Sequence, residues 1–207
     1  MKNTPVRLSL ALFISALAAV SLSAAANEKT SFSIDPTAAW LKTSAGDADL
    51  AGIGGTAQFH IGELFVFDAS LRGSYAYLSS TDSSDVERHD SDVDLVLSGS
   101  LLGFLVPYAT AGVSYDKTDA IAYSGSSDWD AGLALGAGVE ITLIPKLLSV
   151  TPAVRYVEAE HTDTVTYSVD AQFHLTVVAL GVRATYEDNL SRDGDYTTVS
   201  AYASLRF

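Results

Sequence analysis

The chain has 207 residues, with 25 Asp or Glu and 12 Lys or Arg, so its net charge at neutral pH is −13. A strongly acidic chain without basic clusters argues against nucleic-acid binding, which depends on cationic contacts to phosphates. The sequence contains no cysteine, which excludes disulfide bonds and thiolate metal sites.

The first 26 residues have the pattern of a secretory signal peptide. Lys2 and Arg7 precede an apolar run from Leu8 to Leu22, and small residues follow up to Ala26. We predict cleavage after Ala26, which leaves residues 27–207 as one domain. Its net charge is −15, because the leader carries two basic residues and no acidic ones. The alternative is an uncleaved anchor. No later segment approaches 18 consecutive apolar residues, so the sequence predicts no membrane-spanning helix after export.

The rest of the chain consists of segments in which every second residue is nonpolar, separated by polar loops rich in Asp, Ser and Gly. This period is typical of β-strands with one apolar and one polar face. The predicted strands cover residues 31–42, 51–60, 64–78, 93–101, 109–115, 129–141, 150–156, 165–173, 177–186 and 196–207. Tight turns are predicted around 61–63, 103–104 and 144–146, and an acidic loop over 79–91.

The region 164–187 decides the number of strands. Its apolar residues change parity between Phe173 and Val178, which indicates a turn or a bulge, since a slip of one residue exchanges the two faces. We predict a turn here and therefore ten strands, with short and long connections in strict alternation. Eight strands, with 164–187 as one bulged strand, are the alternative. Nine are disfavoured, because both termini are expected at the same end of a barrel.

The last predicted strand ends in Phe207, with nonpolar residues at every second position behind it. In a bilayer such a strand is viable only within a closed barrel, because every backbone N–H and C=O must find a partner. This ending resembles that of bacterial outer-membrane β-barrel proteins, in which a terminal Phe is the usual assembly signal. The predicted fold is therefore an all-β, closed, antiparallel, up-and-down transmembrane β-barrel. The pattern resembles the opacity-like, porin-like superfamily of these proteins.

Two groups of aromatic residues on the predicted lipid face, one toward each end of the strands, support a barrel whose apolar residues face lipid. Amphipathic rings favour the headgroup level of a bilayer. The loop-proximal group is Trp40, Tyr75, Tyr77, Tyr115, Trp129, Tyr156, Tyr167 and Tyr186. The group at the opposite ends of the strands is Phe32, Phe59, Phe65, Phe173 and Phe207. The alternative is a lipocalin-like barrel, which would point its apolar residues inward.

Charged residues fall on the predicted inner face at mid-strand depth, where isolated charges are costly to desolvate. They are Asp35, Asp68, Arg72, Asp94, Glu140, Arg155, Asp170, Arg183 and Arg206. One interpretation is a salt-bridged interior that plugs the barrel; the other is a narrow ion path lined by these charges. The plug is favoured, because barrels of about eight strands leave room only for side chains.

The predicted acidic loop contains clustered carboxylates that could bind Ca²⁺ or share divalent ions with lipopolysaccharide phosphates. They are Asp82, Asp85, Glu87, Asp90 and Asp92, with Arg88 and His89 among them. Their spacing matches no defined calcium-binding motif, which favours a solvated loop without a metal.

Some barrels of this size are lipid A-modifying enzymes or proteases with a His and a carboxylate near the outer rim. Here the rim candidates are His89 with Asp90, and His161 with Asp163. Sequence neighbours on a strand point to opposite faces, so spacing alone does not place either pair. His60 and His174 are predicted at the opposite rim, as turn residues. We therefore predict no catalytic residues and no cofactor.

The resemblance implies a monomeric protein of the bacterial outer membrane. Its expected partners are membrane lipids, lipopolysaccharide and, through the C-terminal strand, the barrel-assembly machinery. The expected role is structural or in surface interaction, with a narrow channel as the first alternative and an enzyme as the second.

Overall fold

The computed structural model describes residues 32–43, 49–81, 86–101, 103–119, 130–160, 162–190 and 195–206. The predicted signal peptide, its cleavage site and Phe207 lie outside the described residues, so all three stay predictions. His161, Asp82, Asp85 and Trp129 also lie outside them. Among the described residues, no helix is long and apolar enough to cross a membrane.

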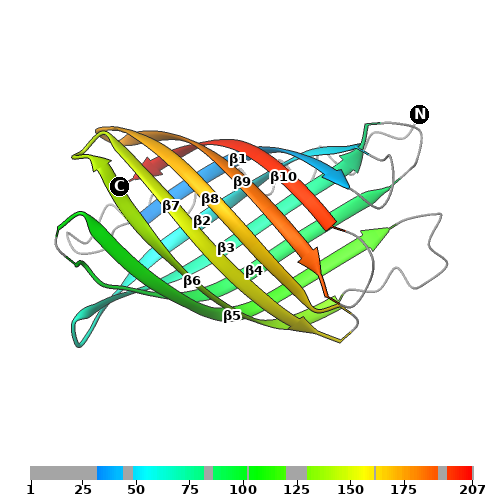
Figure 1. The fold of residues 1–207 in the computed structure, drawn as a ribbon, viewed down its shortest axis with the longest axis horizontal. Coiled ribbons are helices and arrows are strands. Elements are labelled where there is room, and N and C mark those ends of the chain that lie inside the picture. Colours follow the sequence, from blue (N-terminus) through cyan, green and yellow to red (C-terminus); the bar gives the residue numbers. More distant parts are fainter. Residues whose placement is uncertain are drawn as a thin grey trace.

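The described chain forms ten β-strands in sequence order. They are β1 (Phe32–Thr43), β2 (Asp49–Leu64), β3 (Phe67–Ser80), β4 (Glu87–Ser98), β5 (Leu105–Asp119), β6 (Asp130–Ile144), β7 (Leu148–Ala159), β8 (Thr164–Leu175), β9 (Val178–Asn189) and β10 (Asp195–Arg206). Each strand pairs antiparallel with the next, and β1 pairs with β10, which closes the barrel (Figure 1). The prediction of ten strands is confirmed. Residues 176–177 separate β8 from β9, so the alternative of one long bulged strand is wrong.

The alternating pattern places apolar side chains on the outside of the barrel and polar ones inside. On β3, Leu71 and Tyr75 are exposed, whereas Ser70, Arg72 and Ser74 line the interior. The same arrangement recurs around the barrel, where Leu133, Val169 and Val182 are exposed while Asp94 and Asp170 are buried. A lipocalin-like barrel would show the opposite arrangement, so that alternative is wrong. A closed barrel with an apolar exterior pairs all its strands and suits a lipid environment.

The loop-proximal tyrosines lie on the outer surface, as the aromatic pattern predicts. Tyr75, Tyr115, Tyr156, Tyr167 and Tyr186 are all exposed. Each lies in the half of its strand that leads into the connections 81–86, 120–129, 160–163 or 190–194. We call the end of the barrel with these connections the loop end. The opposite end, with the connections 65–66, 99–104, 145–147 and 176–177, is the turn end; the C-terminus of β10 lies there (Figure 1).

Three boundaries differ from the prediction. The acidic segment is shorter than 79–91, because Glu87 to Ser91 belong to β4. The polar run at the start of β4 has no alternating apolar residues, so its strand cannot be recognised from the sequence pattern. The turn predicted at 61–63 lies at Phe65 and Val66, and Gly62 follows a bulge in β2. Connection lengths also do not alternate strictly, since 99–104 at the turn end is longer than 160–163 at the loop end.

Candidate functional site

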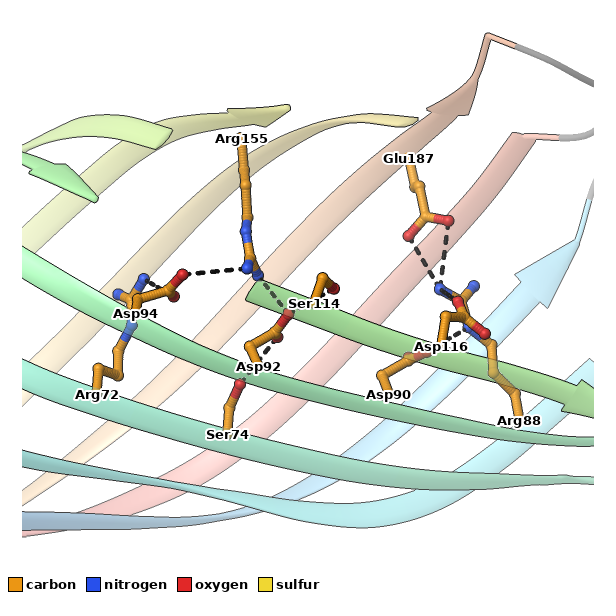
Figure 2. A network of polar contacts seen from close by, with 10 residues as sticks. All are labelled: Arg72, Ser74, Arg88, Asp90, Asp92, Asp94, Ser114, Asp116, Arg155 and Glu187. Atoms are coloured by element: carbon orange, nitrogen blue, oxygen red, sulfur yellow. Dashed lines mark hydrogen bonds and ion pairs between the residues drawn. The ribbon is translucent and has the colours of Figure 1, made fainter. Parts of the chain in front are cut away.

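Arg88 on β4 spans the lumen near the loop end. Its Nε donates to Asp90 Oδ1 at 2.7 Å, and its Nη2 lies 2.9 Å from Asp116 Oδ2 and 3.2 Å from Glu187 Oε2. Glu187 belongs to β9, and four strands separate β4 from β9 in either direction around the barrel. The ion pair therefore crosses the full width of the lumen (Figure 2).

Apolar side chains fill the lumen beside this ion pair. Leu50 and Leu78 are only 2% and 3% exposed, and Val86 and Tyr196 pack against them. The Arg88 guanidinium lies 5.0 Å from the centroid of the Tyr196 ring, within the range of a cation–π contact. We call this set the outer plug: Arg88, Asp90, Asp116, Glu187, Leu50, Leu78, Val86 and Tyr196. It combines charge pairing with apolar packing, and both exclude water.

A second set of ion pairs lies deeper in the lumen, and Arg155 on β7 reaches across to β4 to join it (Figure 2). Asp94 accepts from Arg72 Nη2 at 2.9 Å and from Arg155 Nη2 at 3.2 Å. Asp92 lies 2.8 Å from Arg155 Nη1 and accepts from the hydroxyls of Ser74 at 2.9 Å and Ser114 at 2.7 Å. Arg72, Asp92, Asp94 and Arg155 form the middle network.

Asp170 organises a third group on the neighbouring strands β8, β9 and β10. It accepts from Arg183 Nε at 2.8 Å and from the Tyr202 hydroxyl at 2.5 Å. The Tyr202 ring lies over Gly181, its register partner, where an added Cβ would collide with the ring. Tyr108 lies over Gly138 in the same way. These glycines leave the space that lets two large rings lie flat against the inner wall.

The lumen contains a cavity of about 650 Å³, lined mainly by polar side chains. The middle network and the Asp170 group line it, together with residues toward the turn end such as His60, Ser98 and Gln172. Of the described residues that line it, none belongs to the outer plug. The cavity therefore lies on the turn-end side of the outer plug.

Most of the predicted lumen charges face this cavity. Its lining includes Asp35, Arg72, Asp94, Glu140, Arg155, Asp170 and Arg183. Asp68 does not: it is exposed, next to the β2–β3 turn. The Arg206 side chain lies outside the described part of the chain.

The sequence pattern does not predict the outer plug. It predicts Arg88, Asp90 and Asp92 in a loop, whereas the structure places them on β4 and inside the lumen. Leu50 and Leu78 are not among the predicted lumen residues, because the pattern predicts apolar residues toward lipid. Their parity, opposite to that of the exposed Ile53 and outward-facing Tyr77, could have identified them.

The histidines do not form the geometry of a catalytic pair in the described part of the chain. His89 points outward, where its Nδ1 lies 2.9 Å from the Tyr75 hydroxyl and its ring 5.0 Å from that of Tyr77. Asp90 points inward to Arg88. His174 Nε2 lies 3.0 Å from the Ser149 hydroxyl, near the turn end. No described group of three or more His, Asp or Glu residues is arranged to hold a metal ion.

The chain is similar, at low sequence identity, to several solved structures of outer-membrane proteins. The attachment invasion locus protein Ail of Yersinia pestis is 14% identical, with a TM-score of 0.47 over 86% of this chain and 97% of its own. Neisserial surface protein A is 14% identical, with a TM-score of 0.40 over 86% of this chain and 97% of its own. The N-terminal β-barrel domain of Pseudomonas aeruginosa OprF is 15% identical, with a TM-score of 0.42 over 84% of this chain and 97% of its own. No family model and no curated protein matches the sequence. What the structure itself shows is a closed ten-stranded antiparallel β-barrel with an apolar exterior.

Proposed function

We propose that this protein is a structural barrel of the outer membrane whose lumen is closed at rest and whose loop end forms a contact surface. The observation that carries the proposal is the outer plug, in which Arg88 joins strands on opposite sides of the barrel. The apolar packing of Leu50 and Leu78 adds a layer that water does not readily cross. A barrel closed in this way stabilises the membrane without conducting through it.

The proposed partners follow from this placement. The outer surface contacts membrane lipids, and the acidic loop end faces lipopolysaccharide, whose phosphates can share divalent cations with carboxylates. The C-terminal strand β10, which closes the barrel against β1, is the proposed contact with an assembly machinery. The barrel is proposed to be monomeric. A non-catalytic role is favoured because His89 and Asp90 point to opposite faces.

The test is the conductance of the refolded protein in a planar bilayer. Wild-type protein is expected to be silent. The Arg88→Met variant is expected to leak, because three carboxylates lose their shared cation and repel one another across the lumen. Lys117→Met is the matched control: it also removes one positive charge, but from the face of β5 that carries the exposed Tyr115. Regular stepwise openings of wild-type protein would overturn the proposal.

A narrow channel is the second candidate, and the cavity of about 650 Å³ favours it. In the outer plug and the middle network, carboxylates outnumber guanidinium groups: Asp90, Asp92, Asp94, Asp116 and Glu187 face Arg72, Arg88 and Arg155. Any current through this lumen should therefore prefer cations over anions. A reversal potential measured in a salt gradient distinguishes this cation preference from a nonselective membrane defect.

A further inference from the structure

The turn end carries large apolar side chains where water-exposed turns normally carry polar ones. Phe65 and Val66, which form the β2–β3 turn, are 91% and 83% exposed. Exposed apolar residues also occur in or beside the other turns: Leu101 at the β4–β5 turn, Leu143 at the β6–β7 turn and Val177 at the β8–β9 turn. Each of the four connections of this end therefore has at least one exposed apolar side chain in it or beside it.

Turn formation does not explain these residues. Two-residue hairpin turns favour Asn and Gly, which tolerate a positive φ. Here Phe65 has φ 60° and Thr176 has φ 52°, in a region that bulky and β-branched residues rarely adopt. The chain thus accepts backbone strain and exposes a phenyl ring at the same position. Asn or Gly would form these turns with less strain, so the presence of Phe and Thr calls for a reason other than turn formation.

Backbone groups in two of these turns are hydrogen-bonded to a neighbouring strand. The N–H of Thr142 donates to the Phe104 carbonyl at 2.9 Å, and the N–H of His174 donates to the Leu147 carbonyl at 2.8 Å. Leu101 and Leu105 exchange two further bonds, at 2.7 and 3.1 Å. Such pairing lowers the cost of removing these groups from water, which a lipid environment demands.

We propose that the turn end is immersed in the periplasmic leaflet, with its apolar side chains among the phospholipid acyl chains. The occupant follows from continuity, because the apolar exterior of the strands runs into Phe65, Leu101 and Leu143. The charged residues Glu63, Asp68 and Lys146 are also exposed at this end. The loop end differs, since its tyrosines pair with carboxylates: Tyr77 with Glu87 and Tyr186 with Asp195.

The strands have 12 to 16 residues, whereas about 9–11 tilted residues cross a bilayer. If the hydrocarbon layer begins at the turns, the strand residues in excess of those that cross the bilayer lie at the loop end. The outer plug then stands at or above the headgroup level of the outer leaflet. The proposal does not depend on whether the lumen conducts.

Single-cysteine labelling tests the proposal, because the native chain has no cysteine to remove. Phe65→Cys and, at the loop end, the exposed Glu160→Cys are labelled with the environment-sensitive fluorophore NBD and refolded into phosphatidylethanolamine–phosphatidylglycerol vesicles. Nitroxide-bearing acyl chains should quench the label at position 65 several-fold more than the label at position 160. Aqueous iodide should show the reverse preference.

Only protein that shows a heat-modifiable gel shift is scored, and Val66→Cys replaces Phe65→Cys should the latter fail to fold. Equal access of iodide to positions 65 and 160 in folded protein would overturn the proposal. That result would mean that the apolar turns are exposed to water rather than to lipid.

Discussion

Asp94 illustrates how a single residue specifies the interior of this barrel. Its side chain is 2% exposed and accepts from two guanidinium groups, on Arg72 and Arg155. Gly112 lies directly opposite, at a position where a Cβ would contact the carboxylate. A buried carboxylate is tolerated only when it is paired and hydrogen-bonded, so Asp94 fixes the positions of both arginines.

Replacing Asp94 by Asn should destabilise the barrel by about 2–3 kcal/mol, because Arg72 loses its charged partner and Arg155 loses one of two. The measurement is the free energy of unfolding in urea, with the gel shift as readout. Asp68→Asn is the control: Asp68 is exposed, and its substitution should change stability by less than about 0.5 kcal/mol. Equal effects of the two substitutions would mean that the middle network does not stabilise the fold.

At the residue scale, inward-facing charges are predictable only where the neighbouring apolar residues show the two-residue alternation of a strand. Asp94, Arg155 and Asp170 lie opposite runs of outward Leu, Val and Tyr, so parity placed them correctly. Arg88 and Asp90 lie in a polar run whose period is invisible, because their outward neighbours Glu87 and His89 are polar as well. The local sequence therefore does not show which of these side chains face the lumen.

At the scale of the element, strand pairing depends on matching large and small side chains across the register. Tyr202 faces Gly181 on β9, and Tyr108 faces Gly138 on β6. Each ring packs over a glycine that has no side chain of its own to cover the backbone. This packing is a known way of stabilising strands that contain glycine. Because the pairs are on neighbouring strands, they also help to fix the register.

Gly181→Ala should destabilise the barrel by about 1–3 kcal/mol, since the new Cβ would displace the Tyr202 ring and weaken its bond to Asp170. Thermal unfolding followed by circular dichroism measures the effect. Gly73→Ala is the matched control, because an added Cβ there meets only one backbone oxygen at 3.9 Å. A larger loss at Gly73 than at Gly181 would refute the role assigned to Tyr202.

The ends of the strands were the least predictable part of the elements. The sequence placed a turn at Gly62, the residue with the greatest backbone freedom, but the chain turns at Phe65 and Val66. Gly62 instead follows the bulge, with φ 152°. Turn propensity misleads here because the exposed positions of this end carry apolar residues that local conformation does not favour.

At the scale of the whole molecule, the fold depends on apolar side chains outside the barrel and polar side chains inside it, the opposite of a water-soluble barrel. The strand number followed from parity and from the requirement that both termini lie at one end. The sequence could not show which strands face each other across the lumen, since Arg88 and Glu187 are separated by 99 positions in the chain. Closure of the barrel alone brings them together. The cavity volume was likewise unpredictable, because it is the space left by all ten strands together.

The account rests on lipid outside and a polar cavity inside, and a scan of β3 tests it most directly. Nitroxide labels on single cysteines at Ser70, Leu71, Ser74 and Tyr75 are compared in lipid vesicles. Labels at positions 71 and 75 should be relaxed by oxygen, which concentrates in the acyl chains. Labels at positions 70 and 74, which face the polar cavity, should be relaxed much less by oxygen. An inverted pattern, or no alternation along the strand, would contradict the account.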